Sequence, residues 1–132
     1  MSTEKDYKKP PVKVWEYTIN GKWTVLAGKT DADNDRLSLK EAHPADWWFH
    51  VRGMPGSHVL LKAIPGEEPP KEILKTAAAV AAYHSKARAG GVTPVAGTKA
   101  AFVNKPCGAK PGTVQIRKET LFKVRPGLPD GP

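Results

Sequence analysis

Alternating hydrophobic and polar positions dominate the first part of the chain and predict a β-hairpin. Residues 14–19 and 22–27 each alternate large apolar side chains with polar ones, and Asn20-Gly21 stands between them. Asn and Gly both tolerate positive φ, so this dipeptide is typical of a two-residue turn between antiparallel strands. We therefore expect these two segments to pair.

The rest of the chain predicts more strands and one helix. Ile73, Leu74, Ala77, Val80 and Ala81 recur at helical spacing, which predicts a helix over residues 70–89 that Gly90-Gly91 ends. Strands are expected at residues 37–40, 47–51, 59–63, 100–103, 114–117 and 121–124. Many short strands around one helical pattern predict an α+β fold, an antiparallel β-sheet with one long helix packed on one face.

The segment at residues 46–59 is the richest in candidate chemistry. Side chains alternate between the faces of a strand. The side chains that suit a core are Trp47, Phe49 and Val51. The opposite set, which we expect on an open face, is Trp48, His50 and Arg52. An indole, an imidazole and a guanidinium together suit base stacking and phosphate pairing. The alternative is that Trp48 is only a partly covered edge aromatic.

The turn at residues 53–57 should bring His58 beside that face. His50 and His58 would then form either a two-ligand metal site or a cross-strand pair that meets phosphate. Asp31, Asp33 and Asp35 have the spacing that opens a calcium loop, but the sixth position is arginine instead of glycine. We expect neither a metal nor a cofactor.

Charge is concentrated in the second half of the chain. The formal net charge is +8; residues 1–70 hold ten basic and ten acidic residues, and residues 71–132 hold eleven basic and three acidic ones. A concentrated basic half is the electrostatic footprint of a polyanion binder, although a basic surface without that role is the alternative.

Two Lys-Pro steps, Lys105-Pro106 and Lys110-Pro111, lie five residues apart, and each is followed by a glycine within two residues. Prolines stiffen a loop, and glycines let backbone N–H groups face outward. We expect a preordered cationic loop that binds phosphate at low entropic cost. The alternative is an ordinary connection with two solvated lysines.

Length and composition favour one cytoplasmic domain. The 132 residues suit a single core, with a disordered segment at 1–11, a domain at 12–126 and a tail at 127–132. We find neither a signal-peptide pattern nor an apolar run of membrane-spanning length, so we expect no membrane partner. The single cysteine, Cys107, fits a reducing compartment.

An ordered set of motifs resembles the NFACT-R domain family. It comprises Gly28, Asn34-Asp35, Leu37, residues 46–51, residues 55–59, Lys105-Pro106, Gly108, residues 110–112 and Val114. The resemblance implies an α+β domain that acts as an RNA-binding module. In larger relatives that module belongs to ribosome-associated quality-control factors, which bind the large ribosomal subunit and recruit tRNA. Without room for their other domains, this chain resembles the free-standing form.

We therefore predict an RNA-binding module whose partners are rRNA or tRNA and, by the same resemblance, the large ribosomal subunit. The predicted nucleic-acid-binding residues are Trp48, His50, Arg52, Ser57, His58, Lys105, Lys110 and Arg117. No catalytic residue is assigned, because no nucleophile–base–carboxylate set is recognisable. Two alternatives stay open: an RNA- or nucleotide-processing enzyme that uses His50, His58 and Arg52, and a protein-interaction adaptor in translation quality control.

Overall fold

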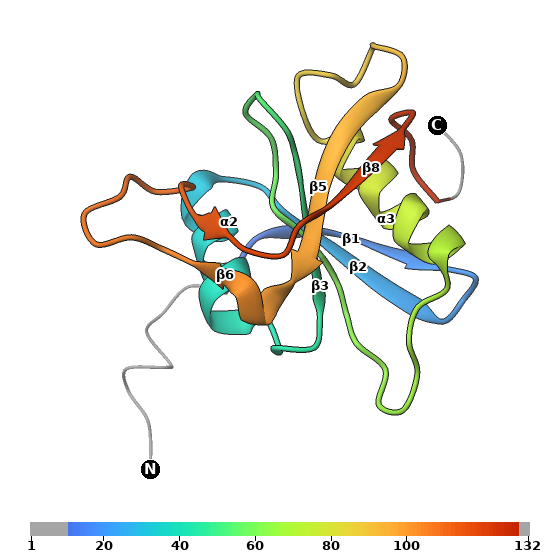
Figure 1. The fold of residues 1–132 in the computed structure, drawn as a ribbon, viewed down its shortest axis with the longest axis horizontal. Helices are drawn as coiled ribbons and strands as arrows, with labels where there is room; N and C mark the ends of the chain where they lie inside the picture. Colours follow the sequence, from blue (N-terminus) through green and yellow to red (C-terminus); the bar gives the residue numbers. More distant parts are fainter. Residues whose placement is uncertain (1–10, 130–132) are drawn as a thin grey trace.

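The structure is a computed structural model that describes residues 11–129 and has an antiparallel sheet at its centre (Figure 1). The strand order is β1-β2-β4-β3-β5-β8, and every neighbouring pair is antiparallel. The α+β fold class is therefore confirmed. Most of the expected N-terminal segment 1–11 and the last three residues of the expected tail lie outside the described residues.

The hairpin at the start of the chain is confirmed. Strands β1 (Val14–Ile19) and β2 (Trp23–Gly28) pair in antiparallel register. Asn20 and Gly21 have φ values of 55° and 65°. Two consecutive positive φ values match the twist of paired strands, which explains why this dipeptide stands at the turn.

The middle of the sheet is built from the strands on either side of the turn at residues 52–58. Strand β3 (Trp47–Val51) pairs with both β4 (Val59–Leu61) and β5 (Thr93–Lys99), and β8 (Thr120–Val124) forms the far edge. A separate small ladder joins β6 (Val103–Asn104) to β7 (Gln115–Ile116). The chain between β6 and β7 contains both Lys-Pro steps.

Strand β5 is a segment that the sequence pattern did not predict as a strand, because it contains Pro94 and Gly97. The strand expected at residues 100–103 is instead a 3₁₀ turn (Ala100–Phe102) that leads into β6. Gly97 is required by packing, since a Cβ there would lie 2.7 Å from the ring of Phe122 and 3.0 Å from that of Phe49. A glycine in a strand marks such a close approach.

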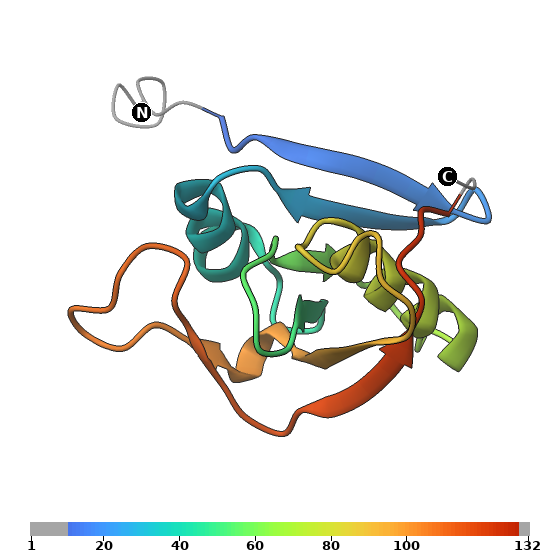
Figure 2. The same cartoon turned by 90° about the horizontal axis from the view of Figure 1, so that it is seen from above.

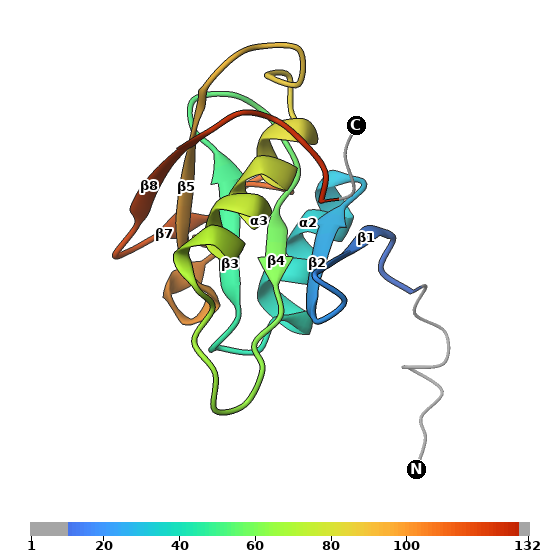
Figure 3. The same cartoon turned by 90° about the vertical axis from the view of Figure 1, so that its right-hand side faces the viewer.

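The long helix covers one face of the sheet but is shorter than predicted (Figure 3). Helix α3 (Lys71–Tyr83) ends six residues before the expected end at residue 89. Ser85 ends it, because its hydroxyl donates to the carbonyl of Ala82 and accepts the N–H of Ala87. The carbonyl of His84 then accepts the N–H of Ser57, so the chain leaves the helix to bond to the β3–β4 turn.

A second helical segment stands where a strand was expected, so the prediction for residues 37–40 is wrong. Helix α2 (Asp31–Arg36) continues into a π-helical turn (Leu37–Glu41). Thr30 and Asp33 form a capping box, in which each side chain accepts the other residue's backbone N–H. The Thr30–Asp33 capping box can be recognised in the sequence. It was not, because the closely spaced aspartates of residues 31–35 are typical of a polar loop.

Both faces of the sheet are covered. The larger core lies between α3 and the sheet and includes Val25, Phe49, Leu61, Ala77 and Val80. The smaller core lies on the other face, where Leu37, Trp48 and Leu60 pack together. No helix among residues 11–129 is long and apolar enough to cross a bilayer.

Candidate nucleic-acid interface

Trp48 lies on the predicted side of β3, but the expectation that this face is open is wrong. Phe49 points to the α3 core with Trp47 packed beside it, whereas Trp48 points to the opposite face. There it is only 3% exposed, packed with Leu37 and Leu60. The cover comes from the helical segment that the sequence pattern assigned to a strand. In this arrangement the Trp48 ring offers no free face to a nucleobase.

A chain of hydrogen bonds runs from Trp48 to His58. The Trp48 Nε1 lies 2.9 Å from the Ser38 hydroxyl, which lies 2.8 Å from Nδ1 of His58. An indole N–H can only donate, so the Ser38 oxygen accepts from Trp48, and the Ser38 hydroxyl donates to Nδ1 when the neutral ring carries its proton on Nε2. Nε2 of His58 lies 3.1 Å from the carbonyl of Gly112 and must therefore carry the ring proton. Both ring nitrogens of His58 are engaged, which fixes its tautomer.

The same histidine is uncharged near neutral pH. His58 is 2% exposed. Burial, and secondarily the neighbouring His50, lower the pKa of His58 to about 4. A neutral, buried imidazole whose two nitrogens are both hydrogen-bonded neither pairs with phosphate as a cation nor exchanges a proton with a substrate. Its role here is to hold Gly112, which belongs to the loop with the two Lys-Pro steps.

His50 lies between these buried groups and solvent. Its ring stacks on Trp48 at 6.0 Å between centroids and meets His58 edge-on at 5.4 Å. Burial lowers the pKa of His50. The structure thus brings the two histidines together, as expected, and His50 is the one that is only partly buried. Within residues 11–129 no group of three His, Cys, Asp or Glu side chains gathers in a way that could hold a metal ion.

A hollow of about 380 Å³ opens beside the two histidines. Its lining includes Trp48, His50, Arg52 and Thr113. Arg52 is exposed, and its guanidinium donates a 2.8 Å hydrogen bond to the carboxylate of Glu119. The face that the sequence predicted as a flat open surface is therefore a shallow hollow with an arginine at its edge.

The Lys-Pro loop, residues 105–113, is anchored to α2. Asp35 accepts the N–H of Gly112 at 3.0 Å through one carboxylate oxygen and pairs with Lys105 at 3.2 Å through the other. Figure 2 shows α2 and the orange loop on the same side of the molecule. Gly112 has φ +85°, and a Cβ there would lie 2.9 Å from the Asp31 carboxylate. The loop is thus fixed from α2 and from His58.

The two loop lysines have different surroundings. Lys105 turns inward, where its ammonium donates to the carbonyl of Lys110 and pairs with Asp35. Lys110 is exposed, and its side chain forms no ion pair among the described residues. The alternative, an ordinary connection with two solvated lysines, does not describe this loop: Lys105 bonds to the loop and to Asp35, and Lys110 faces solvent.

Two more predicted residues occupy contrasting places. Ser57 is half-buried, and its hydroxyl donates to the carbonyl of Gly28 at 2.6 Å, which ties the β3–β4 turn to β2. Arg117 is exposed and lies over the ring of Phe102 at 5.2 Å, next to Lys118 at 5.1 Å. Arg52, Lys110 and Arg117 are therefore the predicted residues that face solvent.

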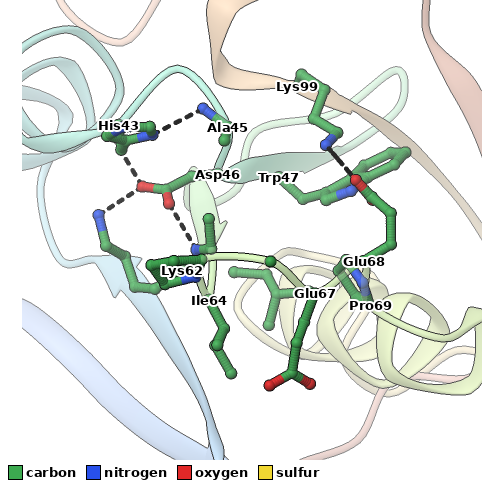
Figure 4. Close-up of a pocket in the computed structure, with 14 residues that line it drawn as sticks. His43, Ala45, Asp46, Trp47, Lys62, Ile64, Glu67, Glu68, Pro69 and Lys99 are labelled. Carbon is green, nitrogen blue, oxygen red and sulfur yellow. Dashed lines mark hydrogen bonds and ion pairs between the residues drawn. The ribbon is translucent and has the colours of Figure 1, made fainter.

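A larger hollow of about 730 Å³ lies at the other end of β3 and β4 (Figure 4). Its lining is mainly apolar and includes Trp47, whose Nε1 has no hydrogen-bond partner. The lysines at this hollow are already paired, Lys62 with Asp46 and Lys99 with Glu68. With its charges neutralised, this hollow suits a polyanion poorly.

Sequence reasoning missed one aromatic and basic region altogether. A polar hollow of about 390 Å³ lies between the end of α3 and the β1–β2 hairpin, and its lining includes Trp15, Lys29, His84, Lys86 and Arg88. These residues come from three separate stretches of the chain. Trp15 was recognised only as one of the alternating positions of the first strand, and no pattern in the sequence linked it to the basic residues near the end of α3.

Comparison with known proteins places the chain among RNA-binding modules. Residues 13–118 match the NFACT protein RNA binding domain. The chain is 38% identical over 107 residues to the Rqc2 homolog RqcH of Streptococcus suis, and 38% identical over 117 residues to that of Bacillus subtilis. These matches cover 81% and 89% of this chain but 19% and 20% of the relatives, so the chain spans about a fifth of their length.

A solved structure agrees with the fold. The C-terminal part of the fibronectin/fibrinogen-binding protein from Streptococcus suis superimposes with a TM-score of 0.80 at 35% identity, over 90% of this chain and 47% of that one. The resemblance carried by the Trp-Phe-His, Pro-Gly-Ser-His and Lys-Pro motifs is confirmed. The chain belongs to the NFACT protein RNA binding domain family.

Proposed function

We propose that this domain binds RNA in translation quality control, and that the anchored Lys-Pro loop is the centre of its RNA surface. The observation that carries the proposal is the double anchoring of this loop, by Asp35 from α2 and by His58 from β4. Membership of an RNA-binding domain family supports it. A loop that is already ordered loses little conformational entropy when it meets phosphate.

The division between inward and outward residues gives each predicted residue a role. Trp48, His58, Ser57 and Lys105 are positioning residues, because their polar atoms bond to other parts of the domain. The exposed cations Lys110, Arg117 and Arg52 are the groups that meet phosphate oxygens. Arg52 first has to exchange its bond with Glu119 for a phosphate. Binding of this kind is electrostatic and weakly sequence-specific.

His50 is the residue that we assign to sugar or base contact. It lines the hollow beside Arg52, and its lowered pKa leaves a neutral ring near neutral pH. A neutral imidazole has one donor and one acceptor nitrogen and can meet a ribose hydroxyl or a base edge. This contact would add selectivity for a sugar or base to an interface whose affinity comes mainly from phosphate contacts.

For the RNA itself we propose a structured ribosome-associated RNA, rRNA or tRNA, met in the cytoplasm and, for rRNA, on the large ribosomal subunit. The support is the similarity to proteins named Rqc2 homolog RqcH. The match covers about a fifth of the length of those relatives, so their complete activity belongs to them.

A salt titration with matched variants tests the proposal. Lys110→Ala should weaken binding to tRNA and to an rRNA fragment alike, and should reduce the slope of log affinity against log salt by about one. Lys75→Ala removes the same charge from an exposed position on α3, the helix on the opposite face, and should leave the slope unchanged. Equal effects of the two substitutions would contradict a site at the loop.

A further inference from the structure

Trp15 is a large aromatic side chain that lies on the surface and not in the core. It is 45% exposed, and of the three large hydrophobic side chains that are exposed within residues 11–129 it is the aromatic one. The strand β1 on which it lies is an edge of the sheet. A single exposed apolar residue needs no explanation on its own, so the surroundings of the ring decide what it can do.

The ring is held in a fixed orientation. His84, at the end of α3, stacks on Trp15 with centroids 5.6 Å apart and planes 14° apart. His84 is itself held by Tyr17, whose hydroxyl lies 2.7 Å from its Nε2. The ammonium of Lys29 lies 4.0 Å from the centroid of the Trp15 ring. The exposed indole is thus a preorganised flat surface with a cation directly over it.

The charge around this ring is positive. The adjoining hollow of about 390 Å³ is lined by Lys29, Lys86 and Arg88, against one carboxylate, that of Asp31. None of the three cations forms an ion pair within residues 11–129. In the apolar hollow of Figure 4, by contrast, Lys62 and Lys99 are both paired with carboxylates. Arg88 donates through Nε to the carbonyl of Tyr83 and lies over the Tyr83 ring. The charge of these cations is not neutralised by a carboxylate, so they can attract an anionic ligand.

From this arrangement we infer that the Trp15 corner, defined as Trp15, Lys29, His84, Lys86 and Arg88, is a binding site for an unpaired nucleotide of RNA. The base stacks on the Trp15 ring in the place of the Lys29 ammonium, which moves to the adjoining phosphate. Lys86 and Arg88 meet the phosphates on either side. The inference rests on the proposed RNA-binding function, which it extends from phosphate contact to the stacking of a base.

An unpaired nucleotide fits better than a duplex. Stacking on a protein side chain requires a free base face, which single-stranded loops and ends offer and paired bases do not. The corner also lies next to the Lys-Pro loop: Asp31 lines the hollow beside Trp15 and lies against Gly112. A single strand that leaves the loop therefore meets the Trp15 corner next.

The test measures binding of the whole chain to a fluorescently labelled oligouridylate of about 12 nucleotides, a length within the site size of single-strand binders. Trp15→Ala should weaken binding by about 5- to 150-fold, the range that one lost base stack gives. Trp15→Phe keeps a flat ring and should recover most of the affinity. Leu121→Ala removes a similarly exposed side chain from β8 and should change nothing.

A second ligand, an abasic oligomer with the same phosphates, separates stacking from charge. Trp15→Ala should bind the abasic oligomer as tightly as the unaltered chain does, because that ligand has no base to stack. Lys29→Ala should weaken binding of both ligands. Circular dichroism of each variant checks that the fold is kept. If Trp15→Ala does not fold, Trp15→Leu takes its place, because leucine keeps apolar bulk on the strand but has no ring on which a base can stack.

The results distinguish the two proposals. If the chain binds tRNA or rRNA but Trp15→Ala binds oligouridylate like the unaltered chain, the Trp15 corner is refuted and the loop proposal stands. Equal weakening of the oligouridylate and the abasic oligomer by Trp15→Ala also refutes stacking. If the folded chain binds neither structured RNA nor oligouridylate, the proposed function itself fails.

Discussion

The two faces of the sheet are built in different ways. On the α3 face, Val25, Phe49 and Leu61 are fully buried against the small side chains of the helix. On the other face the fully buried cluster is smaller, since among residues 11–129 it consists of Leu37, Trp48 and Leu60 with partly buried apolar side chains packed against them. Hydrogen bonds of His58 and Asp35 add directed contacts to this face. Apolar packing has no fixed direction, whereas hydrogen bonds fix the position of each atom.

This difference separates stability from function. The α3 face supplies most of the buried apolar area and stabilises the domain. The opposite face fixes a loop that has little core of its own: His58 holds the carbonyl of Gly112, and Asp35 holds its N–H. We expect substitutions on the first face to act on the free energy of unfolding, and substitutions on the second to act also on the order of the loop.

The largest effect is expected on the α3 face. Phe49→Ala removes a fully buried ring that packs on Trp47 and Phe122. The lost contacts and the cavity should lower the free energy of unfolding by about 3–5 kcal/mol, measured by urea denaturation. Leu121→Ala, at an exposed position of β8, should change it by less than about 0.5 kcal/mol. Similar losses for both variants would mean that the packing on this face is not tight.

A smaller but more selective effect is expected for His58→Phe. Phenylalanine keeps a ring of similar shape but leaves the Ser38 hydroxyl and the Gly112 carbonyl without their partner. The loss of two hydrogen bonds, one to a buried hydroxyl and one to a partly buried carbonyl, should cost roughly 2–4 kcal/mol of unfolding free energy. The amide hydrogen of Gly112 should also exchange faster than in Phe49→Ala when the two are compared at equal stability. Unchanged exchange would show that His58 does not hold the loop.

Sequence reasoning predicted the strand alternation at β3 and failed on what covers it. Trp47 and Trp48 do lie on opposite faces, because alternation is a local property of the strand. The burial of Trp48 depends on residues 31–41 folding as a helix, and on Ser38 reaching its indole nitrogen. No local pattern in residues 46–52 contains that information.

The same distinction explains the Lys-Pro loop and the Trp15 corner. The prolines and glycines indicated a stiff cationic loop. Its two lysines differ because Asp35, seventy residues before Lys105 in the sequence, forms an ion pair with Lys105 and not with Lys110. Trp15, Lys29 and Arg88 are adjacent only because β1, β2 and the end of α3 meet. Motifs within one segment are readable from the sequence; contacts between segments depend on the fold.

Acid should lower the free energy of unfolding through His58, on the face of the sheet that holds the Lys-Pro loop. Burial lowers the pKa of His58 in the folded domain to about 4, from 6.5 when the side chain is free, so the unfolded chain binds the proton more tightly. The stabilising contribution is complete above pH 6.5 and is lost as the pH falls from 6.5 to 4. Within that window His58 alone should contribute a slope of up to about 1.4 kcal/mol per pH unit.

The control for this pH dependence is His58→Phe, which removes the titrating group. Its unfolding free energy should vary less between pH 6.5 and 4 than that of the unaltered chain. His84, whose pKa burial also lowers to about 4, remains in that variant and should leave a smaller slope. An identical slope in the two proteins would assign the acid sensitivity to groups other than His58.

The smallest expected effect on stability, and the sharpest on function, distinguishes the two loop lysines. Lys105→Ala breaks the ion pair with Asp35 and the bond to the carbonyl of Lys110, so the loop should lose order. Lys110→Ala removes an exposed charge and should leave the loop unchanged. Both variants should bind RNA more weakly, but only Lys105→Ala should speed hydrogen exchange at Gly112. Faster exchange in Lys110→Ala, or normal RNA affinity in both variants, would show that anchoring of the loop and RNA binding are separate properties.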